Sequence, residues 1–518
     1  MKPEYFGAYY ESILEKEVRK RGGIYYTPQP IVDYLVADSV GKLLQGKTPS
    51  EAAKIRIVDP ACGGGIFLLG AYQYLLDWHE KHSGKLTLAK RHKILTDNIF
   101  GVDIDPLAVE ITKYCLAMKC SEGYGFTFDF SENIRCGNSL IETNFHWQRE
   151  FPRVFQQGGF DIVIGNPPYG AKYPVEHKGY FLKHYKSAKT TTINGGNGNV
   201  KTKGSLDTFS LFIENGFNNL RENGFLTFIV PLSVVSSDSM AALHDLLEKH
   251  CSVIKVASLC DRPQQIFRHS HKKTAIISFR KDNQKNKCIL STQMYRKDKG
   301  MSLEDFISQF KFIDVSGLGL DGRYAKISLP IEKRILKKLR KIKTNIGTLK
   351  KDEGKTIYYR FSGGMYYNII TNYSSGSTQE RSLYFEKMLA NSIGAILSSS
   401  LFWWYQQVYT DNLHIKSSEI ESFPIPVAAL TASVRRKIEK LYERYLQDIE
   451  HHVNERESHE YKHITKFKEY KIRYSKVLID AMDDIICPLY GLTEAECEFI
   501  KNYELRFRID DPFEEETK

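Results

Sequence analysis

The 518-residue sequence predicts an α/β fold in which helices pack against a mainly parallel β-sheet. Up to about residue 285, short β-branched segments alternate with longer amphipathic ones, the pattern of parallel strands joined by helices. Farther on, lysine-rich segments alternate with aromatic ones, and helical apolar spacing dominates after residue 426. We therefore expect three domains, at 1–285, 286–426 and 427–518.

Six segments have the length and composition of buried strands. They are IRIVDP (55–60), IFGVDID (99–105), FDIVIGN (160–166), GFLTFIVP (224–231), SVIKVASL (252–259) and TAIISF (274–279). Three of them end in a polar residue: Asp59, Asp103 and Asn166. Because ligands of parallel sheets bind at the carboxyl ends of the strands, we expect the functional site at that edge.

Composition excludes several classes of protein. No apolar run approaches the roughly 18 residues of a membrane span. The N-terminus lacks a signal-peptide core, and the nine cysteines are scattered without a CxxC pair, which predicts no disulfide framework and no metal site. The formal net charge of +11 suits a polyanionic partner, although solubility alone explains it equally well.

The stretch IVDPACGGGIFLLGA (57–71) reads as a strand, an acid, a glycine turn and a helix. Without side chains on Gly63, Gly64 and Gly65, a ligand can lie against the backbone. The stretch does not match the GxxxxGK[ST] pattern that holds triphosphates, which favours a flat or neutral ligand. A plain tight turn remains an equal alternative.

Two further strand ends carry polar groups. Asp103, in GVDIDP, stands where an acid accepts hydrogen bonds from ribose hydroxyls, and Asp105 is the expected cap of the following helix. Asn138, in RCGNSL, is able to accept from an adenine amine and donate to a ring nitrogen. In Asn166-Pro167-Pro168-Tyr169 the two prolines end the strand and fix the backbone.

Taken in order, DPACGGG, GVDIDP, GNSL and NPPY resemble the S-adenosylmethionine-dependent methyltransferases that act on adenine amines in DNA. With GGIYYTP (22–28) ahead of them, the order resembles the gamma class, the TaqI-type enzymes, and especially the methylase part of restriction-modification proteins. The resemblance covers residues 10–285 well and 286–518 more loosely. It implies a Rossmann-like methyltransferase domain, a mixed target-recognition domain and terminal helices.

The resemblance also implies a cofactor site. Its expected residues are Tyr26, Thr27, Pro28, Asp59, Ala61, Gly63, Asp103, Ile104, Asn138, Ser139 and Asn166. Thr27 would hold the methionine carboxylate, Asp103 the ribose and Asn138 the cofactor's adenine. The chain departs from the family in having Gly64 where many relatives have serine, and Asn138 where aspartate is usual.

The expected catalytic residues are Asn166, Pro167, Pro168, Tyr169 and Phe267. If the Asn166 side-chain oxygen and the Pro167 carbonyl each accept an amine hydrogen, the lone pair of the adenine nitrogen turns toward the methyl group. Tyr169 would stack on a base flipped out of the duplex. Phe267 would be the ring on its other side, with a buried core position as the alternative.

Contacts with double-stranded DNA are expected from Lys172, Lys201, Lys203 and Arg280, which would close on the duplex from the catalytic side, and from Arg360. The long loop 171–204 holds seven lysines and is either functional or a floppy insertion. The segments 358–373 and 399–426 mix basic and aromatic residues, as target-recognition regions do. Within them we expect Trp403 and Trp404 to be core residues.

About twenty residues precede GGIYYTP, so we expect a methylase without nuclease activity. It would be solitary or paired with a separate restriction endonuclease or other defence-system subunit. We therefore expect a cytoplasmic, nucleoid-associated location in a prokaryotic-type cell and no membrane partner. Three alternatives stay open: methylation of RNA adenine, methylation of protein glutamine, and a non-catalytic DNA-binding subunit.

Overall fold

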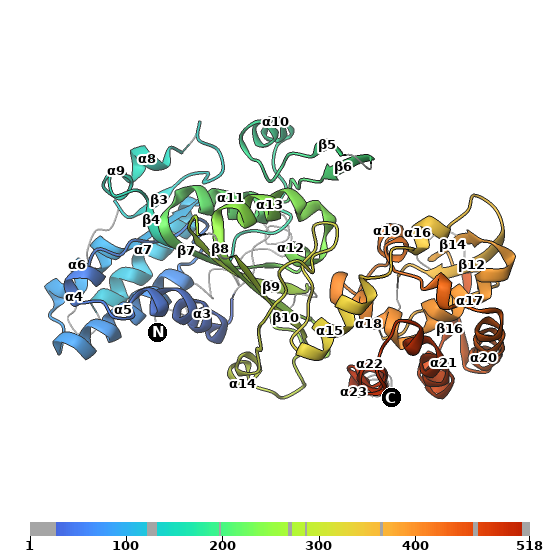
Figure 1. The fold of residues 1–518 in the computed structure, drawn as a ribbon. Coiled ribbons are helices and arrows are strands. Elements are labelled where there is room, and N and C mark those ends of the chain that lie inside the picture. Colours follow the sequence, from blue (N-terminus) through green and yellow to red (C-terminus); the bar gives the residue numbers. More distant parts are fainter. Residues whose placement is uncertain are drawn as a thin grey trace. The chain divides into compact units, whose positions relative to one another are not determined.

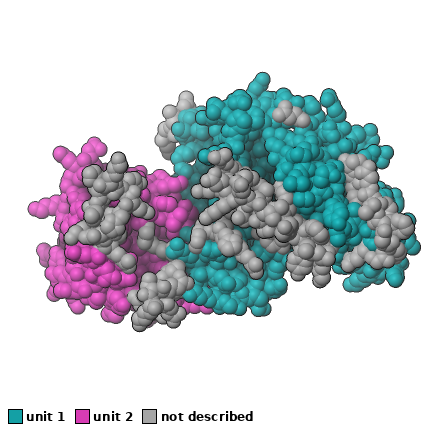
Figure 2. Space-filling model, turned by 180° about the vertical axis from the view of Figure 1, so that it is seen from behind, with its two compact units in different colours: residues 1–325 teal, residues 326–518 magenta. Residues whose placement is uncertain are grey.

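The computed structural model describes residues 27–121, 132–143, 145–195, 198–267, 272–284, 287–362, 366–458 and 465–509. It divides into two compact units, residues 1–325 and 326–518, which Figure 2 colours teal and magenta. Each unit has its own apolar core. Among the described residues, no helix is long and apolar enough to cross a membrane.

The first unit is built on one large sheet (Figure 1). Its described strands run in the order β11-β10-β8-β9-β7-β4-β1-β2-β3. Their bounds are β1 Ile57–Asp59, β2 Ile99–Asp103, β3 Ile134–Cys136, β4 Phe160–Gly165, β7 Leu220–Pro231, β8 Cys251–Leu259, β9 Thr274–Lys281, β10 Cys288–Tyr295 and β11 Ile313–Asp314. All six predicted strands are present. The sheet is mainly parallel, but β9 runs antiparallel between β7 and β8, and β11 runs antiparallel to β10.

Helices cover both faces of this sheet because alternate strand residues point to opposite sides. Ile57, Ile162 and Ile164 pack in one core with the helices α3, α5, α6 and α7, whereas Val58 and Val163 pack in the other with α11 and α13. These helices are α3 Gln29–Val36, α5 Ile66–Ser83, α6 Leu88–Asn98, α7 Pro106–Cys120, α11 Thr208–Asn219 and α13 Ala241–His250. The shorter ones are η1 Ala37–Gly41, α4 Pro49–Ala52, α8 Trp147–Glu150, α9 Pro152–Phe155, α12 Ser233–Ser236, η2 Asp238–Met240 and α14 Leu303–Ser308.

The connection at 171–204 is not a plain loop. It forms a helix, α10 (Val175–His184), and a hairpin, β5 (Thr191–Gly195) with β6 (Gly198–Thr202). Figure 1 shows α10 and this hairpin next to each other beyond α11. The segment folds because the buried ring of Phe181 packs edge-on against Tyr173 and Tyr185, with ring centroids 5.0 and 5.8 Å away.

The second unit combines a small antiparallel sheet with helices. The sheet has the order β13-β12-β14, with β12 Lys355–Arg360, β13 Ile370–Thr371 and β14 Glu380–Phe385. The other elements are α15 Pro330–Leu339, α16 Ile346–Leu349, α17 Lys387–Ser398, α18 Ser400–Tyr409, α19 Ser417–Glu421, η3 Val427–Ala429, α20 Ala432–His451, β15 Val453–Ser458, β16 Thr465–Tyr470, η4 Ile472–Ser475, α21 Lys476–Leu489, α22 Glu494–Asn502 and α23 Leu505–Ile509. Trp403 and Trp404 are buried here, as expected of core residues.

The first unit extends past the expected boundary at residue 285. The reason is that β10 pairs with β8, which keeps residues 286–325 with the large sheet. The helices after residue 426 likewise belong with 326–426: the Tyr442 hydroxyl donates to the Ile370 carbonyl, and Lys338 pairs with Glu496 at 2.6 Å. The structure thus has one boundary, after Ala325, where the sequence suggested two.

Candidate active site

Three polar strand ends meet at one edge of the large sheet. β1 lies between β2 and β4 and is parallel to both, so Asp59, Asp103 and Asn166 all follow carboxyl ends of adjacent strands. The connections from β1 to β2 and from β3 to β4 run to opposite sides of β1. Ligands of open α/β sheets bind at such a reversal of strand order.

The turn after β1 is shaped by its backbone. The amide of Gly63 donates to Asp103 Oδ2 at 2.8 Å, and the Thr112 hydroxyl donates to the Gly63 carbonyl at 2.7 Å. Gly65 has a φ of +82°, and a Cβ there would lie 2.9 Å from the Thr112 side chain. Both the conformation and the close approach therefore require glycine at this position. Thr112, which the sequence did not single out, holds the turn from α7.

Asp103 is half-buried at the end of β2. Its second oxygen, Oδ1, accepts from the Asp105 amide at 2.9 Å. Each carboxylate oxygen has a further lone pair, so Asp103 keeps the capacity to accept from a hydroxyl pair such as that of ribose. Ile104 next to it is 67% exposed, which offers an apolar surface to a flat ring.

Asp59 is buried beneath the turn. Its Oδ1 accepts from the Ala61 amide at 2.9 Å, and a Cβ on Gly165 would lie 2.6 Å from the same oxygen. Burial raises the pKa of Asp59 to about 8, the charge of Asp103 adds to the rise, and the Ala61 amide opposes it. Burial also raises the pKa of Asp103. A cationic group at this edge would meet two acids that ionise to receive it.

Residues 166–169, which we call the NPPY rim, follow β4 directly. The Asn166 amide nitrogen donates to Thr27 Oγ1 at 3.0 Å, and the Asn166 oxygen accepts from the Tyr169 hydroxyl. Since the nitrogen faces Thr27, the oxygen faces the other way, toward a donor. The carboxamide is thereby oriented to accept, which is the direction that amine recognition requires.

Residues at the start of α11 fix the rim in place. The Thr208 hydroxyl donates to the Pro168 carbonyl at 2.7 Å, and the Gly170 amide donates to Asp207 at 3.0 Å. Sequence reasoning noted only Phe209 in this stretch, and Phe209 is buried in the core. No local pattern distinguishes Thr208 from an ordinary helix start, which is why it was missed.

Tyr169 and Phe267 are both buried in apolar cores of the first unit. The Tyr169 ring is 3% exposed, with Lys272 Nζ 5.6 Å from its centroid. Tyr169 packs in the core that contains Val163 and Phe209, and Phe267, also 3% exposed, packs in the core that contains Ile31 and Ile164. The burial of Phe267 favours its alternative, a core position, and the Tyr169 ring is likewise enclosed, so neither ring presents an open stacking face in this structure.

The turn after β3 is tied to the same edge. Asn138 Oδ1 accepts from the Leu140 amide at 3.1 Å, and the buried Ser139 hydroxyl donates to the Pro60 carbonyl. The Ser139 carbonyl accepts from Trp147 Nε1 and Asn215 Nδ2. Ser139 thus fastens this turn to the turn after β1, and Asn138 next to it is half-buried.

The residues ahead of α3 reach the same place. Thr27 is 2% exposed, and its contact with Asn166 spans 139 positions of the chain. Pro28 caps the amino end of α3. Tyr26 and most of the GGIYYTP stretch lie outside the described residues.

The five predicted DNA contacts are dispersed. Lys172 and Lys201 are exposed on the segment after the rim, and Lys203 there pairs with Asp238. Arg360 lies in the second unit, where it donates to Ser377 Oγ at 3.1 Å. Arg280 is placed wrongly by the prediction: because β9 runs antiparallel, Arg280 pairs with Phe225 of β7, which is level with Ile162 near the amino end of β4 and away from Asn166. It binds Asn223 there.

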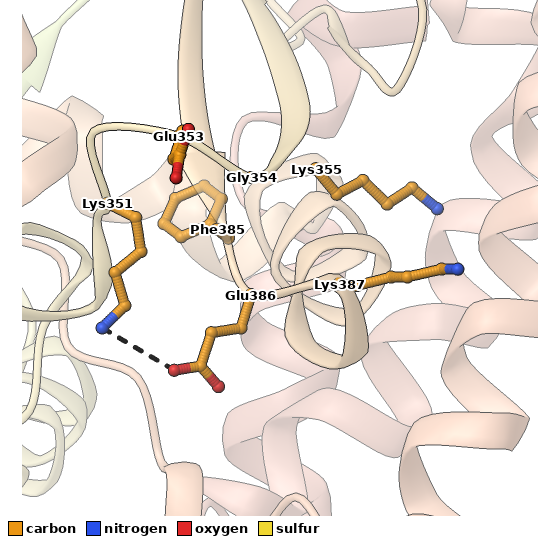
Figure 3. Close-up of a pocket in the computed structure, with 7 residues that line it drawn as sticks. All are labelled: Lys351, Glu353, Gly354, Lys355, Phe385, Glu386 and Lys387. Atoms are coloured by element: carbon orange, nitrogen blue, oxygen red, sulfur yellow. Dashed lines mark ion pairs between the residues drawn. The ribbon is translucent and has the colours of Figure 1, made fainter.

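The second unit has a pocket of about 440 Å³ where β12, β14 and α17 meet (Figure 3). Lys351 pairs with Glu386 at 3.7 Å across its mouth. In Figure 3 the side chains of Lys355 and Lys387 extend in the same direction, away from Lys351 and Glu386. Both lysines line the pocket, and sequence analysis did not single them out.

The strand order and the residues of the site together define the class of protein. The antiparallel strand inserted between β7 and β8, the glycine turn after β1 and the NPPY rim after β4 are those of an S-adenosylmethionine-dependent methyltransferase fold. The Type IIL restriction-modification enzyme MmeI, solved in complex with DNA, has a similar fold: its TM-score is 0.59 at 13% identity, over 98% of this chain and 82% of that one. The predicted fold class is confirmed.

The sequence comparisons cover a smaller part of the chain than this structural comparison does. Residues 97–267 match the model of the Eco57I restriction-modification methylase family. The type II restriction enzyme and methyltransferase RM.Eco57I of Escherichia coli is 25% identical over 322 residues, 55% of this chain and 30% of that protein. The type II methyltransferase M.TthHB8I of Thermus thermophilus is 32% identical over 200 residues, 38% of this chain and 33% of that protein. The chain thus spans about a third of these relatives, and the predicted resemblance to restriction-modification methylases is confirmed.

Proposed function

We propose that the chain is a site-specific DNA adenine-N6 methyltransferase. It transfers a methyl group from S-adenosylmethionine to an adenine flipped out of duplex DNA, within a restriction-modification or related defence system. The observation that carries the proposal is the fixed orientation of the Asn166 carboxamide, whose nitrogen is held by Thr27. The oxygen already accepts from a hydroxyl, so the rim is built to receive a donor.

The described residues fit the cofactor. The turn at Gly63 leaves the backbone accessible, Asp103 offers its lone pairs to a ribose, and the buried acid Asp59 suits the methionine ammonium group. Asn138 would contact the adenine of the cofactor, and the exposed Ile104 would offer that ring an apolar face. When bound, S-adenosylmethionine would supply a methyl group activated by its sulfonium charge.

The rim residues prepare the adenine. Asn166 Oδ1 and the Pro167 carbonyl each accept one hydrogen of the amine, so its lone pair turns out of the ring plane toward the methyl group. The amine nitrogen held by these acceptors would take the methyl group as that group leaves the sulfur of the cofactor, and the nitrogen would then release one proton to solvent. Pro167 and Pro168 keep the acceptors fixed, which lowers the cost of reorganisation.

Binding of DNA would use both units. The exposed lysines Lys172 and Lys201 follow the rim, and in the second unit Arg360 and the pocket residues Lys355 and Lys387 suit phosphates. We assign target recognition to residues 326–426, with the later helices as their support. A cytoplasmic, nucleoid-associated protein, acting alone or with a separate restriction endonuclease or other defence-system subunit, agrees with this role.

A single labelling experiment tests the proposal. Purified protein is incubated with methyl-labelled S-adenosylmethionine and, in separate reactions, plasmid duplex DNA, structured RNA and bacterial release factor. We expect N6-methyladenine in the nucleoside digest of the DNA and no label in the other two acceptors. Label on cytosine alone, or only in RNA or protein, would overturn the assignment. Cofactor binding without transfer to any acceptor would favour a non-catalytic DNA-binding subunit.

A further inference from the structure

Val175 is 85% exposed, the largest exposed fraction among the large apolar side chains that the structure describes. A single exposed apolar residue is common on protein surfaces and needs no explanation by itself. The exposure of Val175 is informative because of where this residue lies in the chain. It is the first residue of α10, it follows Pro174, and it lies six residues after Tyr169 of the catalytic rim.

The chain between Tyr169 and Val175 is fixed. The Gly170 amide donates to Asp207, the Ala171 amide to Thr208 Oγ1 at 3.3 Å, and the Tyr173 hydroxyl to the Leu206 carbonyl at 2.9 Å. Six residues span at most about 20 Å even when fully extended. Val175 therefore lies within about 20 Å of Tyr169, on a stretch of chain that these hydrogen bonds hold in place.

The far side of α10 is anchored as well. The Tyr180 hydroxyl accepts from the Glu142 amide at 3.0 Å, and the Tyr185 hydroxyl donates to the Leu140 carbonyl at 2.8 Å. The amides of Lys186 and Ser187 both donate to the Glu214 carboxylate. A helix held at both ends presents its first side chain in a constant position.

The surroundings of Val175 are strongly basic. Residues 172–189 hold five exposed lysines and one glutamate; the lysines are Lys172, Lys178, Lys183, Lys186 and Lys189. Phosphates attract such a surface, whereas the stacked bases between the strands offer an apolar environment. An apolar side chain surrounded by cations therefore matches duplex DNA, since proteins that deform DNA insert apolar side chains between base steps in this way.

We propose that Val175 enters the duplex beside the target and fills the space that the adenine leaves when it flips out. The inference rests on the proposed function and deepens it: Val175 is a positioning residue that favours the flipped state and does not contact the reacting atoms. Its effect should disappear where the target adenine has no partner to leave, because unpairing is then no longer required.

The test compares Val175→Ala with the native protein on two duplexes. Both contain the methylated site recovered by sequencing plasmid DNA from cells that express the protein; in the second, an abasic position faces the target adenine. On the paired duplex, loss of two methyl groups should lower kcat/KM about tenfold. On the duplex with the abasic position, the two proteins should agree within about twofold.

Two further variants complete the design. Val477, 78% exposed at the start of α21 in the second unit, is the matched control, and Val477→Ala should leave both rates unchanged. Val175→Ile should retain the native rate. Equal rates for Val175→Ala and the native protein on paired DNA would overturn the inference, as would an equal loss on both duplexes. Either result leaves adenine methylation by the native protein, and hence the proposed function, intact.

Discussion

The hydrogen bond from Asn166 to Thr27 provides the sharpest test of how the rim works. Thr27→Val replaces the hydroxyl by a methyl group of nearly the same size at a position that is 2% exposed. The Asn166 amide nitrogen, whose bond to Thr27 Oγ1 is 3.0 Å long, then loses that acceptor. An unsatisfied buried donor costs about 1–3 kcal/mol. If that cost destabilises the orientation in which the Asn166 oxygen accepts from the adenine amine, kcat/KM for DNA drops about 5- to 150-fold.

The assay must separate this role from the expected one of Thr27 in holding the methionine carboxylate. Steady-state methyl transfer at saturating cofactor gives kcat, and a fluorescence titration gives the Kd for S-adenosylmethionine. We expect a lower kcat in Thr27→Val and recovery in Thr27→Ser, which restores the hydroxyl. A normal kcat with a weakened cofactor Kd would refute the orienting role and leave only a cofactor contact.

Three other predictions concern the same edge of the sheet. Tyr169→Phe keeps the ring but removes the hydroxyl that donates to Asn166, so kcat/KM for DNA should rise about two- to tenfold in the steady-state assay. Gly165→Ala places a Cβ 2.6 Å from Asp59 Oδ1, so the melting temperature and the cofactor affinity should both fall. The control is Gly179→Ala, whose Cβ has no atom within 4 Å. It should leave both quantities unchanged or slightly raise the melting temperature. Asp59→Asn should flatten the pH dependence of the free energy of unfolding between about pH 4 and 8.

The sign of the last prediction follows from proton counts. With a folded-state pKa of about 8, Asp59 keeps its proton in the folded protein at neutral pH but loses it on unfolding, where its pKa is about 3.9. The folded state therefore binds more protons, and Asp59 makes stability fall as the pH rises toward 8. Denaturant titrations of both proteins at pH 5 and pH 8 measure the difference. An identical pH dependence in Asp59→Asn would contradict the raised pKa of Asp59. An unchanged melting temperature and cofactor affinity in Gly165→Ala would contradict the close approach of Gly165 to Asp59. A loss of activity in Tyr169→Phe would contradict the competition of its hydroxyl for the Asn166 oxygen.

The strands that position the site could be predicted because their signals are local. β1, β2 and β4 are short β-branched runs that end in Asp59, Asp103 and Asn166, and each is followed by turn residues. The direction of a strand within its sheet, in contrast, cannot be predicted from the residues of that strand alone. Arg280 was misplaced because β9 inserts antiparallel, which moves its last residues away from Asn166.

Contacts between distant segments explain the remaining differences. Phe267 precedes basic residues, as an exposed ring would, but α3 and the central strands enclose it. The segment 171–204 lacks clear periodicity, yet it folds because Tyr180 and Tyr185 bind backbone groups near residue 140. The partnership of Thr27 with Asn166 likewise joins positions 139 apart.

The most direct test of the central claim is single-turnover methyl transfer by Asn166→Ala. A catalytic group that stabilises the transition state by hydrogen bonding contributes about 10²–10³ in rate. We predict a loss of that size in N6-methyladenine formed on duplex DNA, with cofactor binding and the melting temperature close to native. Transfer at the native rate by Asn166→Ala would contradict the claim that this carboxamide activates the adenine amine.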